Sequence, residues 1–235
     1  MPSYLATHDS VAYSVRISSR AKRARIEISA LGKVHVIVPK RFNHQHIPGF
    51  IAQHRQWIHK TLRRIDRPPQ TMLARPTTMQ LLAIDEQWRI TYDSQQQKPL
   101  IAHHEECQLN LCTHTEARPQ LTQWLHHHAR RHLIQKLTEY SELTGLSYNK
   151  VFIKNQKTRW GSCSSKGNIN LNRNLLFLPQ ALVNYVLVHE LCHTMHLNHS
   201  ARFWRLVERY QPSYHQYDKQ LHHAHRYIPA WAFPD

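Results

Sequence analysis

The sequence predicts an α+β protein in which a β-rich region with one long helix precedes a region of helices around a small sheet. Up to about residue 115, apolar and polar residues alternate with the period of two that is typical of half-buried strands. From Pro119 onwards, apolar residues recur at helical spacing instead. We therefore expect two domains, a basic β-rich one at residues 1–118 and a second at residues 119–235.

The N-terminal domain is expected to begin with three strands, at residues 11–18, 24–29 and 33–38. Leu31 and Gly32 predict a hairpin turn between the second and the third. A single long helix should follow from about residue 43 to residue 65, because its apolar residues fall on one stripe and Pro48 fits its first turn. After a proline-rich loop, we expect further strands at residues 80–84, 88–92, 100–102 and 107–111.

The C-terminal domain is expected to begin with a long helix that starts near Pro119. Gly145 predicts its end, since glycine readily adopts the left-handed conformation of a helix cap. Three consecutive histidines, His126 to His128, lie on this helix. Because consecutive helical residues point in different directions, we expect these side chains to be exposed or half-buried and not to act together as ligands.

Two more helices are expected beyond a strand at residues 150–154 and a hairpin at residues 160–171. The first should run from Pro179 to about Leu197. Ser200 can cap the second, whose apolar face ends before Pro212. A short last helix is expected at about residues 214–223.

The most informative stretch is residues 189–193, which read His-Glu-Leu-Cys-His. Two histidines four apart on a helix lie on one face, close enough for both rings to hold one metal ion. The glutamate beside the first histidine can take a proton from a water held by that metal. We therefore predict a metal-dependent hydrolase, most simply a zinc peptidase with one zinc ion per chain, in which Glu190 is the general base.

A third ligand would complete this site, and three residues compete for the role. His196 lies on the same stripe, but three residues in a row on a straight helix do not converge easily on one ion. His199 lies beyond Asn198, where the chain can turn and let the ring swing back. Glu208, on the next helix, offers a distant carboxylate. We favour His199, because it completes a tripod of His189, His193 and His199 with one open position.

Two segments of the chain resemble the YgjP-like metallopeptidases, which are related to the SprT-like minimal zincins. Residues 159–172 read RWGSCSSKGNINLN, and residues 189–204 read HELCHTMHLNHSARFW. The basic strands around residues 20–38 and the segment Gln56-Trp57-Ile58 are similar to the N-terminal part of that family. Residues 68–118 match no pattern that we can name.

This resemblance implies a zincin-like mini-domain, in which a small sheet with an edge strand along the cleft accompanies the helix that carries the active site. It also implies that His189, His193 and His199 are metal ligands and that Glu190 is the catalytic base. The hairpin at residues 160–171 is the candidate for the edge, where a peptide could pair across the metal. Arg159, beside that cleft, is a candidate contact for a carboxylate or phosphate of the substrate.

The net charge of +16 is compatible with substrates and partners other than a simple peptide. Residues 1–67 hold 13 Lys and Arg against 3 Asp and Glu, a balance that attracts polyanions. One alternative is therefore a nucleoside-triphosphate (UTP) pyrophosphatase that uses the same metal site, an activity that the resemblance also allows. Another is a DNA-associated SprT-like protease whose basic N-terminal region contacts nucleic acid.

Composition also bounds the location of the protein. No apolar run approaches the roughly 18 residues of a membrane helix, and residues 1–9 show no signal-peptide pattern. We expect a cytoplasmic protein with no membrane partner. In that reducing compartment the four cysteines should be free thiols.

Overall fold

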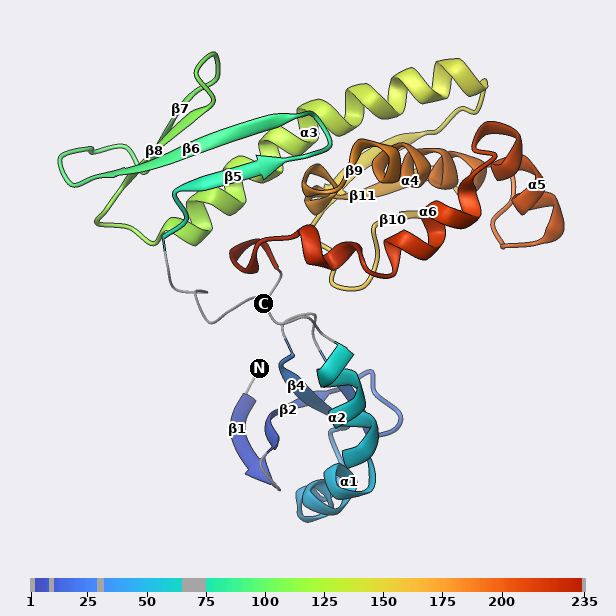
Figure 1. The fold of residues 1–235 in the computed structure, drawn as a ribbon. Helices are drawn as coiled ribbons and strands as arrows, with labels where there is room; N and C mark the ends of the chain where they lie inside the picture. Colours follow the sequence, from blue (N-terminus) through green and yellow to red (C-terminus); the bar gives the residue numbers. More distant parts are fainter. Residues whose placement is uncertain (1–2, 9–10, 29–31, 65–74, 234–235) are drawn as a thin grey trace. The chain divides into compact units, whose positions relative to one another are not determined.

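The computed structural model describes residues 3–8, 11–28, 32–64 and 75–233. The chain forms two compact units, Met1–Thr71 and Met72–Asp235, and each is described by itself (Figure 1). The strands between residues 78 and 112 belong to the second unit. These units do not test the expected boundary at residue 119, so a catalytic domain that begins there stays a prediction.

The first unit is a four-stranded sheet with helices on one face. Its strands β1 (Ser3–His8), β2 (Val11–Ser18), β3 (Arg25–Ile28) and β4 (Val34–Pro39) lie in the order β1-β2-β4-β3. The pair β2–β4 is parallel, while β1–β2 and β3–β4 are antiparallel. Alternate residues of β2 and β4 pack with the helices in one apolar core, which includes Val15, Val36, Ile51 and Ile58. The expected strands are therefore present, although Leu31 of the expected turn lies outside the described residues.

The single helix expected at residues 43–65 is wrong, because the chain forms three shorter helical segments. These are a 3-10 turn η1 (His44–His46), α1 (Ile47–Gln53) and α2 (Arg55–Arg64). The break falls at His54, whose backbone N–H bonds to Ile51 O at 3.1 Å and whose Nδ1 lies 2.9 Å from Phe50 O. This side chain competes for a backbone carbonyl of its own helix and tightens the turn. Residue 65 lies outside the described residues.

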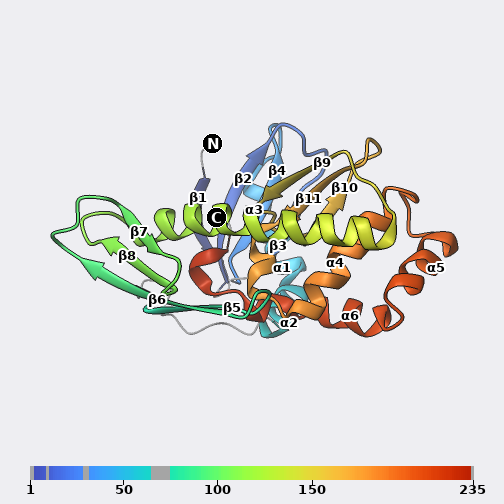
Figure 2. The ribbon, with the colours of Figure 1, turned by 90° about the horizontal axis from the view of Figure 1, so that it is seen from above.

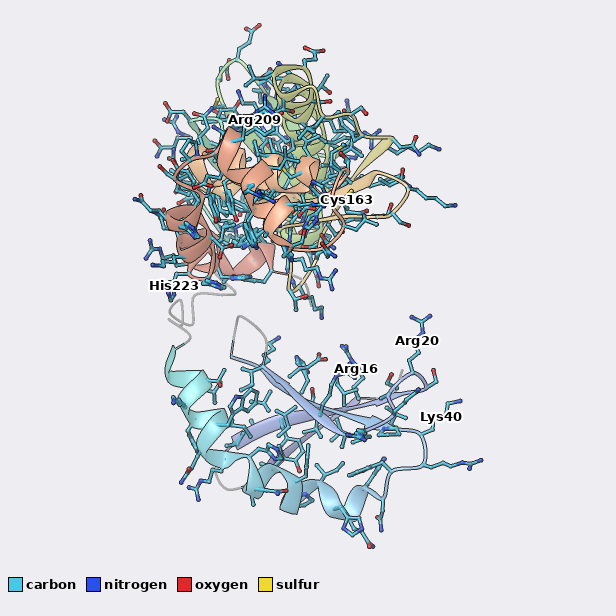
Figure 3. The ribbon with its side chains drawn as sticks, turned by 90° about the vertical axis from the view of Figure 1, so that its right-hand side faces the viewer. Arg16, Arg20, Lys40, Cys163, Arg209 and His223 are labelled. Carbon is cyan, nitrogen blue, oxygen red and sulfur yellow. The ribbon has the colours of Figure 1, made fainter. Side chains whose placement is uncertain are left out.

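The first unit carries much of the positive charge. Arg16, Arg20 and Lys40 are exposed and project outward in Figure 3. Glu27 is the one acidic residue in the described part of this unit, and it pairs with Arg25 at 2.8 Å. Binding of nucleic acid by this region stays a prediction.

The second unit begins with another four-stranded sheet. Its strands β5 (Thr78–Leu81), β6 (Glu86–Asp93), β7 (Leu100–His103) and β8 (Gln108–Cys112) lie in the order β5-β6-β8-β7, with β6 and β8 parallel. Their alternating apolar residues, among them Trp88, Ile90, Leu109 and Leu111, are buried. The four strand-like runs of residues 80–111 are thus strands, with bounds shifted by a few residues.

A long helix, α3 (Ala117–Thr144), follows this sheet. Figures 1 and 2 show α3 running from the β5–β8 sheet towards α5, and it contacts β8, β9 and α4 along the way. Gly145 ends the helix with φ 70°, as expected for a left-handed cap. The expectation for His126 to His128 is wrong at one residue, since His128 is only 3% exposed. Its ring stacks on Trp124 of the preceding turn, so it belongs to the core.

The third sheet has three strands, β9 (Lys150–Lys154), β10 (Gly161–Cys163) and β11 (Asn168–Asn172), in the order β10-β11-β9. The pair β10–β11 forms the expected antiparallel hairpin, and β11–β9 is parallel. Strand β10 therefore lies at an edge of this sheet. After a 3-10 segment, η3 (Arg173–Phe177), the chain enters the helix that carries the His-Glu-Leu-Cys-His stretch.

That helix, α4 (Gln180–Cys192), is buried on nearly every side and contacts α3, β10, α5 (Ala201–Tyr210) and α6 (Tyr214–Leu221). Ser200 caps α5 through Phe203 N, as expected. Two 3-10 segments, η4 (Ala224–Tyr227) and η5 (Ala230–Ala232), end the described chain. No helix among the described residues has the length and apolar character needed to cross a membrane.

The expected end of α4 near Leu197 is wrong. The helix ends at Cys192. The backbone hydrogen bonds from Thr194 N to Leu191 O and from Met195 N to Cys192 O then span three residues, whereas those of an α-helix span four. This tighter turn brings His196 O to 3.0 Å from His193 Nδ1. The chain can then reverse towards α5.

Candidate metal centre

Three imidazole nitrogens meet at the C-terminal end of α4. His189 Nε2 lies 3.2 Å from His193 Nε2 and 3.2 Å from His199 Nε2. His189 and His193 are one helical turn apart, and the turn after Cys192 returns His199 to the same place. The structure thus brings together the three residues that the sequence analysis favoured.

The hydrogen-bond partners of the Nδ1 atoms of His193 and His189 determine which nitrogens of these two rings carry protons. The carbonyl of His196 can only accept, so His193 Nδ1–H donates to it at 3.0 Å. Tyr185 Oη gives its own proton to Asp218 Oδ1 at 3.2 Å, so His189 Nδ1–H donates to the Tyr185 oxygen at 3.4 Å. Burial lowers the pKa of both histidines, that of His189 to about 3, so both rings are neutral. Their Nε2 lone pairs therefore face each other at 3.2 Å.

This arrangement fits a divalent metal ion. Two unprotonated nitrogens repel each other unless a cation lies between them. Ligands on one tetrahedral zinc, at about 2.0–2.1 Å from the ion, would lie about 3.3 Å apart. The observed separations of 3.2 Å match that spacing. Both Nδ1 atoms also have partners that hold the rings in the ligating tautomer.

Aromatic side chains fix the orientation of the three rings. Phe203 is fully buried, and its ring lies 4.3 Å from that of His193, 4.9 Å from that of His199 and 5.0 Å from that of His189. The exposed ring of His199 also stacks on Trp204 at 5.4 Å. Helix α5 therefore holds the third histidine in place through packing.

The two other candidates for the third ligand do not join this group. His196 contributes its backbone carbonyl to His193, and Glu208 is exposed on α5. Among the described residues, the donor atoms within 4.8 Å of one another at this place belong to His189, His193 and His199.

The carboxyl group of Glu190, the residue that follows His189 on α4, is buried. The residue is 5% exposed, and its Oε2 has no hydrogen-bond partner among the described residues. Burial raises the pKa of Glu190 to about 8, while the charge of Arg159 opposes the rise. A carboxyl group with a pKa near neutrality and an unpartnered oxygen can take up a proton and release it again.

Strand β10 lies against this glutamate. A Cβ atom built on Gly161 would be 2.5 Å from Glu190 Oε1 and 2.6 Å from its Cγ. A side chain at residue 161 would therefore displace Glu190 from its observed position. The sequence analysis did not single out Gly161, because a glycine next to Trp160 in a hairpin carries no sign of what packs on it.

Strand β10 pairs with β11 on one side, and its other side pairs with no strand of this sheet. Backbone bonds join Trp160 O to Asn172 N and Ser164 N to Asn168 O, so the pairing with β11 falls on even-numbered residues. In an antiparallel pair the residues between them direct their N–H and C=O groups to the opposite side. Gly161 and Cys163 are these residues, and they lie at the edge of the sheet.

Behind the first histidine, Tyr185 and Asp218 form a chain of hydrogen bonds that sequence reasoning missed. Tyr185 is 1% exposed on α4, and Asp218 comes from α6. The position of Tyr185, one turn before His189, was a signal that could have been used. Asp218 carried no such signal, since its contact depends on how α6 packs on α4.

Comparisons with known proteins point to a metallopeptidase family. Residues 22–224 match the YgjP-like metallopeptidase domain. Among solved structures, the metallopeptidase zymogen abylysin of Pyrococcus abyssi is similar at 27% identity over 38% of this chain and 90% of that one, with a TM-score of 0.35. A search of curated proteins found no match.

The matched metallopeptidase domain indicates a metal-dependent hydrolase. The chain belongs to the YgjP-like metallopeptidase family, which confirms the resemblance found in the sequence. Membership of this family implies a divalent metal ion.

Proposed function

We propose that the protein is a zinc-dependent metallopeptidase in which His189, His193 and His199 hold the ion and Glu190 is the general base. Two observations support this proposal. The Nε2 lone pairs of His189 and His193 face each other, and Oε2 of Glu190 has no hydrogen-bond partner among the described residues. A zinc ion supplies Lewis acidity when it is bound there, which acidifies a water molecule and polarises a substrate carbonyl.

The residues of the chain perform the proton transfers. Glu190 Oε2 accepts a proton from the attacking water and later gives it to the leaving amine nitrogen. In the metal-free chain burial raises the pKa of Glu190 to about 8, and a bound cation would favour the carboxylate form that accepts the proton. Gly161 sets the position of the carboxyl group by packing on it.

Substrate binding is assigned to the edge of the three-stranded sheet. An extended peptide can add to β10 as a further strand and bond to the outward N–H and C=O groups of Gly161 and Cys163. Because Gly161 touches Glu190, a peptide paired there would lie beside the base. This arrangement supports the zincin-like mini-domain expected from the family.

Arg159 is proposed to contact the substrate. It is exposed, precedes the edge strand by two residues and lies near enough to Glu190 for its charge to lower the pKa of that carboxyl group. An arginine at this place can bind a carboxylate or a carbonyl of the peptide.

The test is proteolysis of an unfolded protein by the purified, zinc-loaded chain. We expect cleavage that a chelator abolishes and zinc restores. Glu190→Gln should keep its zinc and lose activity by at least about 100-fold. Glu208→Gln is the matched control, because it makes the same chemical change on the exposed face of α5 and should cleave like the wild type.

Ribonucleoside triphosphates, incubated separately with the same preparations, test the alternative substrate. The proposal predicts that none is split at a rate that depends on Glu190. A Glu190-dependent release of diphosphate from UTP, without cleavage of protein, would overturn the peptidase assignment and leave the metal site intact.

A further inference from the structure

Among residues 3–8, 11–28, 32–64 and 75–233, a second group of side chains brings three donor atoms within 4.8 Å of one another. It consists of Glu86, His128 and His132. Glu86 is the first residue of β6, and the two histidines lie one turn apart on the same face of α3. Glu86 Oε2 lies 2.8 Å from His128 Nε2, and Glu86 Oε1 lies 3.9 Å from His132 Nε2.

We propose that Glu86, His128 and His132 form a second metal site, separate from the three-histidine centre, that binds a zinc-type divalent ion and joins β6 to α3. One carboxylate and two imidazoles are donors that zinc and the neighbouring transition metals accept. The separations of 2.8 and 3.9 Å lie on either side of the value of about 3.3 Å for two ligands of a tetrahedral ion. A small rotation of the His132 side chain would shorten the longer of the two distances.

The surroundings hold two of the three donors in place. Trp88 Nε1–H donates to Glu86 Oε2 at 2.6 Å, and Trp88 is 1% exposed. The ring of His128 is stacked on Trp124, with centroids 4.6 Å apart and planes 18° apart. Packed indoles therefore orient the carboxylate and one imidazole before any ion arrives, as the partners of metal ligands do.

The third side of the group is open, which gives an ion a path to it. The side chains of Glu86 and His132 are 24% and 25% exposed, whereas that of His128 is 1% exposed. His104, on the turn that joins β7 to β8, stacks on His128 at 6.0 Å and adds a third imidazole nearby.

A cationic group already lies against these donors. Arg131 Nη2 is 3.3 Å from His128 Nδ1 and 3.4 Å from His132 Nε2. Both histidine nitrogens accept from the guanidinium of Arg131, so the cluster of Glu86, His128 and His132 already binds a positive charge. Arg131 is exposed and can swing into solvent when an ion takes its place. Removing this competing cation should therefore strengthen metal binding.

The experiment uses the full chain with His189→Ala and His193→Ala, which removes the three-histidine centre. After treatment with a chelator, the protein is titrated with zinc by equilibrium dialysis. We expect one zinc ion per chain. Adding His132→Ala should weaken binding at least tenfold, whereas adding His127→Ala, an exposed neighbour on α3, should leave it unchanged.

Two further variants keep the test decisive if His132→Ala perturbs the fold. Glu86→Gln retains an acceptor for Trp88 and should also weaken binding at least tenfold. Arg131→Gln should tighten it severalfold, while Arg130→Gln on the exposed face of α3 should not. Equal binding by the His132 and His127 variants, or no zinc bound in the background chain, would overturn the site. Peptidase activity of the otherwise unaltered chain is independent of that outcome, so failure here leaves the proposed function standing.

Discussion

Replacing Glu190 by glutamine should change how the stability of the metal-free protein depends on pH. Burial raises the pKa of Glu190 from 4.5 to about 8 in the folded chain, while the unfolded chain regains the ordinary value. Between these two values the folded state holds a proton that the unfolded state has released. Stability of the wild type therefore falls as the pH rises, by about 1.4 kcal/mol per pH unit.

The size of the effect follows from the two pKa values. Between pH 5.5 and pH 8, the free energy of unfolding should fall by about 3 kcal/mol more in the wild type than in Glu190→Gln, because glutamine does not titrate. Subtracting the variant from the wild type removes the titration of the histidines, which both proteins share. The slope applies only while metal is absent, since a bound cation would favour the carboxylate.

Urea unfolding in a chelator, followed by tryptophan fluorescence, measures this difference. Trp57 is the one tryptophan outside residues 72–235, so the signal comes mainly from the second unit. Glu208→Gln serves as the control and should follow the wild type at every pH. A difference between wild type and Glu190→Gln that stays constant from pH 5.5 to pH 8, or grows in the opposite direction, would refute the burial argument.

Two further predictions concern the neighbours of the site. Gly161→Ala should displace the Glu190 side chain, because the new Cβ would lie 2.5 Å from Oε1, and should lower kcat about 100-fold at unchanged zinc content, measured by peptide cleavage and metal analysis. Tyr185→Phe should remove the acceptor for His189 Nδ1–H and raise the Kd for zinc about 10- to 100-fold in a chelator competition, whereas Tyr217→Phe should leave it unchanged. Normal turnover by the alanine variant, or equal zinc affinity in both tyrosine variants, would contradict the geometry.

The parts of the fold that the sequence predicted are those with strong local signals. Alternation indicated the strands of both four-stranded sheets apart from β1, and Gly145 marked the end of α3. The histidine spacing likewise placed His189 and His193 on one face, and the Asn198 turn let His199 join them.

The errors arose where contacts between distant residues or a single side chain decided the outcome. His54 broke a helix by bonding to its own backbone, and His128 was buried because the β5–β8 sheet packs on α3. Gly161 and Asp218 gained their roles only through packing against α4. Periodicity within one element cannot reveal such partners, since they come from other elements.

The most direct test of the central claim is an anomalous diffraction map of a zinc-loaded crystal, recorded on both sides of the zinc edge. The account predicts a peak about 2.0–2.1 Å from the Nε2 atoms of His189, His193 and His199, with Glu190 Oε2 turned towards it. A crystal that contains zinc elsewhere but shows no peak among these three nitrogens would contradict it.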